Sequence, residues 1–465
     1  MMTFNFAGMA RRRHRTTVHG DAPARSRGSA SAGLFRVAAI VAALTLPSAG
    51  YAAESPLTLA EAQRLATARS AQIEAGDLAI SASKDMAVAA AERPDPVVKF
   101  GVDNLPVNGP DRFSVERDFM TMRSVGVMQE ITRPTKLHIR AERSQRAVQL
   151  AEVERTQAVA VVQRDTAVAW LERYYAEAME QNALQQVHAA QLEERAAESA
   201  YRQGQGIAAD VVAARGMLAQ LEDQSTEAAR QVRSSKIALV RWLGTAADWP
   251  LAGEPAIDVI PLHRHTLESQ LAGHPEILAL QRQEELAQSE VELARANRRP
   301  DWTVELMYSQ RGAGFSNMAS LEFSLPLQIN RANRQDRELA AKLAEASKAK
   351  AEREDMLRTH VAEIGAMIDE WDSARQRRER YVKEIIPLAT DRTTTTSAAY
   401  RGGKAKLADV LAARRNEVDV RFQALQIEAR AARLWAELRF IAPGDADATA
   451  AASPDSSAMA SRELP

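Results

Sequence analysis

The chain has 465 residues, of which 26% are charged and only 5% are aromatic, a composition that favours long, closely packed helices over a globule with a large aromatic core. Its 60 basic residues balance 61 acidic ones, so nothing in its charge points to nucleic acid as a partner. The absence of cysteine excludes disulfides, thiolate metal sites and a lipidated N-terminal cysteine.

Residues 1–52 are predicted to be a signal peptide. The first part of this segment is rich in arginine, and residues 37–46 then form a run of about ten apolar residues. The run is too short to cross a bilayer but suits the core of a signal peptide, and the small residues after Pro47 indicate cleavage after Ala52. We therefore expect an exported protein. No later segment approaches the about 18 consecutive apolar residues of a transmembrane helix.

The mature chain is predicted to contain two structural repeats, residues 53–243 and 266–441. They are joined by an equatorial linker, residues 244–265, and followed by a disordered tail, residues 442–465. Each repeat has the order helix, two strands, long helix, tip, shorter helix. In the first repeat these elements are expected at residues 57–92, 98–103, 124–131, 136–201 and 210–243. In the second they are expected at residues 267–297, 302–309, 320–325, 331–399, with a kink at Pro387, and 409–440.

The two tips carry the same motif. Residues 201–215 read YRQGQGIAADVVAAR and residues 400–414 read YRGGKAKLADVLAAR, identical at about nine of fifteen positions. We expect Gly204 and Gly403 to end the long helices, because glycine adopts the left-handed backbone at little cost. Asp210 and Asp409 are expected to begin the next helices by accepting hydrogen bonds from unpaired amides.

Helix lengths predict how the repeats pack. Each long helix, roughly 100 Å at 1.5 Å per residue, matches two short helices stacked end to end. Strands then gather at one end of a rod and tips at the other. The strands alternate apolar and polar residues, and four of them cannot close a barrel. Three copies would supply twelve strands, with apolar side chains facing lipid. A soluble sandwich of the apolar faces is the alternative.

The mature chain resembles the TolC-type outer-membrane efflux factors from about Leu57 to Ile441. The resemblance rests on the duplicated plan, the two tip motifs and the sequence Ile386-Pro387-Leu388 before the second tip. The stretch from Asp103 to Glu130 is most similar to the heavy-metal, CzcC/CusC-like branch. The family resemblance implies a mostly α-helical protein with a trimeric, twelve-stranded transmembrane β-barrel in the outer membrane and a coiled-coil α-helical tunnel in the periplasm.

The resemblance also implies the function and partners. The homotrimer would passively conduct substrate, heavy-metal cations in this branch, from an inner-membrane RND-type pump and a periplasmic adaptor to the exterior. Alternatives are an outer-membrane factor for drug efflux or type I protein secretion, and a structural coiled-coil envelope protein without a pore. We expect no enzyme activity and no cofactor, because no catalytic constellation, phosphate-binding glycine loop or nucleophile elbow is present.

Adaptor docking is predicted at the tips. Ile207 and Leu407 are apolar residues on reversals that a rod would expose to water, where they gain nothing without a partner. The predicted docking surface comprises Gly204, Ile207, Asp210, Gly403, Leu407 and Asp409. Helix termination is the alternative role of its glycines and aspartates.

Family members often narrow the tunnel mouth with acidic residues before the second tip. Here that segment is the threonine run 393–396, with Asp391 as the nearest acid, so Asp391 and Thr394 are the candidates for the pore mouth.

The candidate metal ligands in the sequence are a pair of histidines and three methionines, and neither set forms a recognisable metal-binding motif. His263 and His265 have no carboxylate or thiolate nearby and are expected in a solvated linker. Met120, Met122 and Met128 are either soft metal ligands or packing residues at the barrel rim. We therefore predict no metal site.

Overall fold

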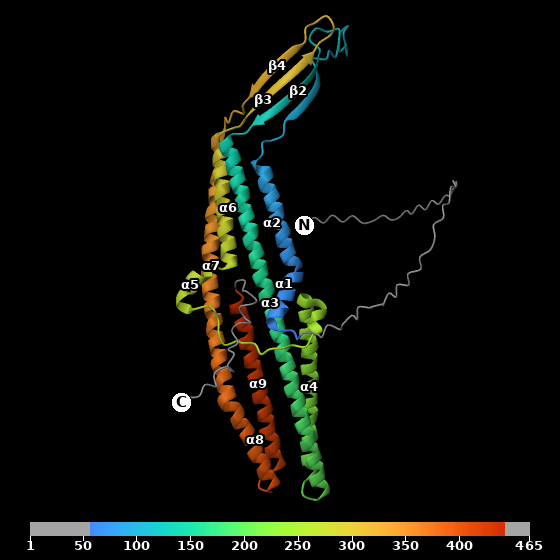
Figure 1. Ribbon diagram of the computed structural model, residues 1–465, viewed down its shortest axis with the longest axis vertical. Coiled ribbons are helices and arrows are strands. Elements are labelled where there is room, and N and C mark those ends of the chain that lie inside the picture. Colours follow the sequence, from blue (N-terminus) through green and yellow to red (C-terminus); the bar gives the residue numbers. More distant parts are fainter. Residues whose placement is uncertain (1–55, 442–465) are drawn as a thin grey trace, which may run out of the picture. The chain divides into compact units, whose positions relative to one another are not determined.

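The computed structural model describes residues 56–441, so the predicted signal peptide and the predicted disordered tail lie outside the described residues. The described part is mostly helical with one four-stranded antiparallel sheet, which confirms the expected fold class (Figure 1). Within these residues no helix is long and apolar enough to cross a membrane.

Each half contributes two helices, two strands and a long helical leg. The first half contains α1 (Leu59–Arg69), α2 (Ala71–Ala91), β1 (Val97–Asp103), β2 (Met122–Ile131), α3 (Pro134–Arg202) and α4 (Ala208–Leu243). The second half contains α5 (Leu267–Leu271), α6 (Pro275–Asn297), β3 (Trp302–Gln310), β4 (Met318–Ser324), α7 (Gln335–Arg380), α8 (Ile386–Arg401) and α9 (Leu407–Arg439). Three short 3-10 helices lie at Gly244–Asp248, Arg264–Thr266 and Arg331–Asn333.

The helices pack lengthwise in the way their lengths predict. The long helix α3 contacts α2 toward the strands and α4 toward the tip, and α7 likewise contacts α6 and α9 (Figure 1). Helix α3 also contacts α6 and α9, so the two halves are joined along their length. At 1.5 Å per residue the 69 residues of α3 span about 100 Å.

Local chemistry explains where the helices begin and break. The side chain of Thr58 accepts the Glu61 amide and caps α1, as expected, but Ser70 then ends α1 and caps α2 by accepting the Ile73 amide. The second leg is interrupted by a π-helical turn, Tyr381–Ile385, immediately before Pro387. Proline lacks the amide and its ring collides with the carbonyl four residues earlier, and a wider turn relieves that collision.

Among residues 56–441 the sheet has no strand beyond β1 or β4, so both of its edges are open. Its order is β1-β2-β3-β4, and every neighbouring pair is antiparallel. The register aligns apolar residues across all four strands on one face, in the row Val98, Val127, Leu306 and Leu321. Phe100, on the same face as Val98, is 81% exposed. A large apolar face left in contact with solvent indicates that something other than residues 56–441 covers it.

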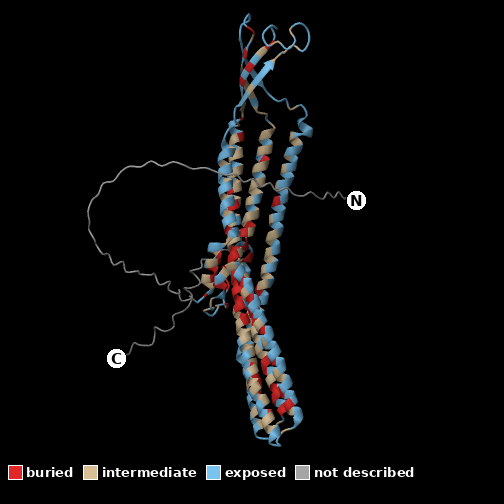
Figure 2. Ribbon diagram, turned by 90° about the vertical axis from the view of Figure 1, so that its right-hand side faces the viewer, coloured by how far each residue is buried: buried red, intermediate tan, exposed pale blue. Residues whose placement is uncertain are grey.

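The main core lies at mid-length, where buried residues concentrate (Figure 2). The linker between the halves is part of this core rather than a solvated connection: Ile257 and Ile260 are buried in it. Two buried tryptophans donate hydrogen bonds to the backbone of segments that enter this core. The indole of Trp170 donates to the Leu57 carbonyl at 3.0 Å, and the indole of Trp435 donates to the Val259 carbonyl at 2.8 Å. His263 and His265 are exposed, as expected.

Candidate functional site: the helical tips and the buried polar network

The first tip reverses the chain between α3 and α4. Gly204 has a φ of 72°, in the left-handed region, and the Gln205 amide donates a hydrogen bond to the Ala200 carbonyl at 2.9 Å. This six-residue hydrogen bond satisfies a carbonyl that the end of a helix would leave unpaired. Ile207 is then the N-cap of α4, in an extended conformation, and is 63% exposed.

The second tip repeats this backbone geometry between α8 and α9. Gly403 has a φ of 70°, and the Lys404 amide donates to the Ala399 carbonyl at 2.8 Å. Here Lys406 is the N-cap, and its own amide donates to the carboxylate of Asp409 at 3.1 Å. The predicted left-handed glycines are therefore present at both tips.

The expected role of the two aspartates needs correction. Asp210 and Asp409 are the third residues of α4 and α9, not their N-caps. Asp409 accepts a hydrogen bond from the backbone amide of Lys406. The N-cap residues themselves, Ile207 and Lys406, have no side-chain acceptor. A carboxylate in the first turn still stabilises a helix, because it faces the positive end of the helix dipole.

The expected exposure of Leu407 is wrong. Its side chain is only 3% exposed, because it packs with Val410 and Leu411 of α9 against Ala197 of α3 and Val211 of α4. In the ungapped alignment of the two motifs, Leu407 corresponds to Ala208 and not to Ile207. A shift of one residue at the start of a helix turns a side chain by about 100°, which is enough to move it from solvent to the interior.

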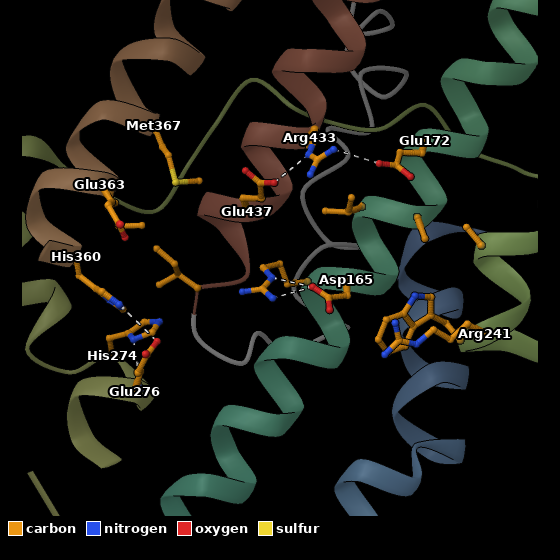
Figure 3. Close-up of a pocket in the computed structure, with 17 residues that line it drawn as sticks. Asp165, Glu172, Arg241, His274, Glu276, His360, Glu363, Met367, Arg433 and Glu437 are labelled. Atoms are coloured by element: carbon orange, nitrogen blue, oxygen red, sulfur yellow. Dashed lines mark hydrogen bonds and ion pairs between the residues drawn. The ribbon is translucent and has the colours of Figure 1, made fainter. Parts of the chain in front are cut away.

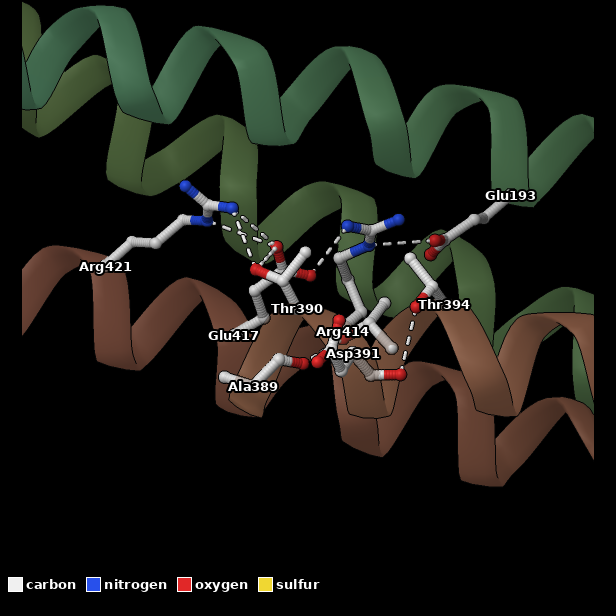
Figure 4. A network of polar contacts seen from close by, with 9 residues as sticks. Glu193, Ala389, Thr390, Asp391, Thr394, Arg414, Glu417 and Arg421 are labelled. Carbon is white, nitrogen blue, oxygen red and sulfur yellow. Dashed lines mark hydrogen bonds and ion pairs between the residues drawn. The ribbon is translucent and has the colours of Figure 1, made fainter. Parts of the chain in front are cut away.

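Above the second tip lies a buried polar network that the sequence analysis missed (Figure 4). Its centre is Glu417 of α9, 4% exposed, whose carboxylate accepts hydrogen bonds from Arg414 at 3.0 Å and Arg421 at 3.0 Å and from the Thr390 hydroxyl at 3.1 Å. Arg414 also donates to Glu193 of α3 at 3.0 Å. The network therefore ties α9 to both α8 and α3.

The surroundings of Glu417 favour its charged form. Burial by itself raises the pKa of this carboxyl, but hydrogen bonds from Arg421 and Thr393 and the charge of Arg414 outweigh burial and lower the pKa. A buried carboxylate is tolerated when it is paired and hydrogen-bonded in this way.

A signal for the network was present in the repeat. Arg414 ends the second motif and Arg215 ends the first, and Arg215 also pairs with acids of α3, donating to Glu194 at 3.0 Å and to Glu198. The repeated arginine therefore joins each returning helix to the long helix beside it.

The predicted pore-mouth residues lie on the exposed side of α8, within this region. Asp391 and Thr394 are both exposed, and the Thr394 hydroxyl donates to the Asp391 carbonyl at 3.0 Å (Figure 4). Thr393, between them, is buried and donates to the Ala389 carbonyl. The structure thus separates the threonine run into one residue that packs inward and neighbours that face out.

Residues 266–443 match the model of a protein family described as Outer membrane efflux protein. The match covers most of the second half of the chain.

Solved structures share the fold of this chain over both of its halves. A structure of CusC, described in terms of folding and transmembrane channel formation, has 14% identity and a TM-score of 0.71, and the match covers 83% of this chain and 92% of that one. The outer membrane protein VceC of Vibrio cholerae has 17% identity and a TM-score of 0.69, covering 83% and 96%. The open MtrE outer membrane channel of Neisseria gonorrhoeae has 15% identity and a TM-score of 0.66, covering 83% and 89%.

These structural similarities show a shared fold, and their low identity selects no branch of the family. No curated protein sequence matches the chain.

Proposed function

We propose that three copies of the chain form the outer-membrane conduit of a tripartite efflux system. The observation that carries this proposal is the open sheet with one exposed apolar face. Its unpaired edge strands, β1 and β4, are suited to pairing with β4 and β1 of neighbouring copies, and a twelve-stranded barrel removes every edge. The apolar face then contacts lipid and the opposite face lines an aqueous channel.

Sparse burial in the helices nearest the strands supports the trimer. Ile73 is the one buried residue of α2, whereas Leu78, Met86 and Val88 of the same helix are 64%, 66% and 69% exposed. Apolar side chains at this density on a helix gain stability only when another surface covers them. Neighbouring copies joined through the sheet supply that surface.

The tips are the proposed docking surface for a periplasmic adaptor, which connects the channel to an inner-membrane RND-type pump. Of the residues expected there, Ile207 is the exposed apolar contact, and Gly204 and Gly403 with Asp210 and Asp409 shape the two reversals. Leu407 supports this surface from inside the bundle. Asp391 and Thr394 are proposed to line the mouth of the tunnel near the second tip.

For the substrate we propose heavy-metal cations with an affinity for sulfur, and the polar face of the sheet supports this class. Four consecutive cross-strand rows on that face each carry one methionine: Met122, Met318, Met307 and Met128. Rows on one face are about 7 Å apart, so a cation moving along the wall would meet a thioether in every row. Organic drugs and secreted proteins do not bind thioethers as soft metal ions do, so a row of methionines does not favour those alternatives.

The experiment is complementation of a host strain that lacks this gene. Wild-type protein is expected to restore resistance to silver and copper ions but not to organic dyes. Ile207→Asp is expected to abolish resistance while trimers remain in the outer membrane, because aspartate is a favoured N-cap residue and does not unfold α4. Replacement of the four methionines by leucine, which keeps their volume, is expected to reduce metal resistance selectively.

Ser234→Asp is the control, since Ser234 is an exposed polar residue on the same helix but far along the chain from the tip. It should complement as wild type does. Dye resistance restored by wild type and by the leucine variant alike would identify a drug channel instead. Loss of trimers in Ile207→Asp would assign Ile207 to assembly and not to docking.

A further inference from the structure

Two histidines and a glutamate from distant parts of the chain meet at mid-length. His274 precedes α6, Glu276 lies in its first turn, and His360 lies on α7. One potential ligand atom from each residue lies within 4.8 Å of the others, the single such group of three histidine or acidic side chains among residues 56–441. The imidazoles of His274 and His360 are 5.2 Å apart between centroids and nearly perpendicular.

The three side chains project into one cleft of about 780 Å³ (Figure 3). Nε2 of His360 is 3.5 Å from a carboxylate oxygen of Glu276. Two ligands of one zinc ion, each bound at about 2.0–2.1 Å, lie roughly 3.3 Å apart, so this pair is already at a suitable separation. The third ligand atom, from His274, must move about 1–1.5 Å closer to the other two, and rotation of its partly exposed ring provides that movement.

The second ring is oriented by its surroundings. Nδ1 of His274 accepts the Glu276 amide at a long 3.3 Å, and the backbone of Ile441 also hydrogen bonds to this ring. A ligating histidine commonly has its other nitrogen held by a backbone carbonyl, which fixes the orientation of the ring.

Charge in the cleft also suits a cation. Glu363, one turn after His360 on α7, lines the same cleft, and Arg164 on the opposite wall is hydrogen-bonded to Asp165 at 2.9 Å. The cleft therefore holds a second carboxylate near the three residues, and the charge of Arg164 is offset by Asp165.

We propose that His274, Glu276 and His360 bind a divalent transition-metal ion, with zinc as the reference ion. Two imidazoles and one carboxylate are a ligand set for zinc, copper, nickel or cobalt and not for magnesium or calcium. The ion joins the start of α6 to α7 and, through Ile441, to the end of α9. This site is independent of the substrate that the channel conducts.

The test is calorimetric titration of zinc into the metal-stripped, full-length protein in detergent. We expect one zinc ion per protomer. His274→Asn, Glu276→Gln and His360→Gln should each weaken binding about 100-fold or more, the upper end of what loss of an outer-shell partner costs. His274→Asn retains a side chain that caps α6. With cobalt in place of zinc, the visible spectrum should show nitrogen ligation that all three variants lose.

The matched control is the double variant His263→Ala/His265→Ala, which removes the other closely spaced histidine pair, with rings 5.8 Å apart. It should bind zinc as wild type does. Unchanged affinity in His360→Gln, or loss of binding in the control instead, would overturn the proposal, as would a wild-type protein that binds no zinc. Circular dichroism of the metal-free variants identifies any loss of affinity that comes from unfolding.

Discussion

The two tips share a sequence motif and a turn but differ in what surrounds them. At the first tip, α4 packs mainly on α3, and the start of α4 is exposed. At the second tip, the start of α9 lies in an apolar cluster with residues of α3 and α4 and with Tyr400 of α8. The difference teaches that a repeated motif specifies the backbone reversal, whereas the neighbours of each copy decide which of its side chains are buried.

The largest effect should come from placing aspartate at the equivalent position of each tip. Leu407→Asp puts a carboxylate where a 3% exposed leucine packs, and loss of the leucine side chain alone costs about 2–5 kcal/mol. Ala208→Asp, at the exposed equivalent position, places a charge at the favourable end of a helix and should not lower stability. Thermal unfolding followed by circular dichroism measures both. Equal melting temperatures would mean that the two tips are packed alike.

The next effect concerns the arginine that ends each motif. Arg414→Met leaves Glu417 buried without one of its cations, and breaking a buried ion pair typically costs about 3–5 kcal/mol. Arg215→Met removes ion pairs from a side chain that is 60% exposed and should leave the melting temperature unchanged. Adding Glu417→Gln to Arg414→Met should recover part of the loss, because it removes the orphaned charge. A double variant less stable than Arg414→Met would contradict this account of the network.

The sequence was sufficient for whatever depends on local chemistry. Helix lengths, the alternating strands, the two left-handed glycines and the interruption at Pro387 all follow from residues close to them in the chain. The structure was needed for features that depend on contacts between residues far apart in the chain. Leu407 is buried by residues of α3 and α4, and Glu417 meets Glu193 through Arg414 across more than 200 positions. The mixed apolar and charged composition of α9 gives no sign of which neighbour each side chain meets.

The pH dependence of stability gives a smaller effect that belongs to the second tip. Because the folded-state pKa of Glu417 is lowered, its contribution to stability is fully present above the pKa of the unfolded chain, about 4.3. It is lost as pH falls through the lowered folded-state pKa. Unfolding by urea between about pH 5 and pH 2 should therefore show a steeper loss in wild type than in Glu417→Gln. Parallel curves for the two proteins would show that Glu417 does not contribute to acid sensitivity.

The smallest effect should be the same at both tips, which tests what they share. Gly204 and Gly403 have nearly equal positive φ angles, 72° and 70°, and a β-carbon added at either would meet no atom within 4 Å. Alanine at either position is therefore penalised by the left-handed backbone alone, about 1–2 kcal/mol. Asparagine, which adopts this conformation more readily, should cost less at both tips. If Gly403→Ala proved far more destabilising than Gly204→Ala in thermal unfolding, the crowded surroundings of the second tip would extend to its turn, and the reversal itself would no longer be a local property of the repeated motif.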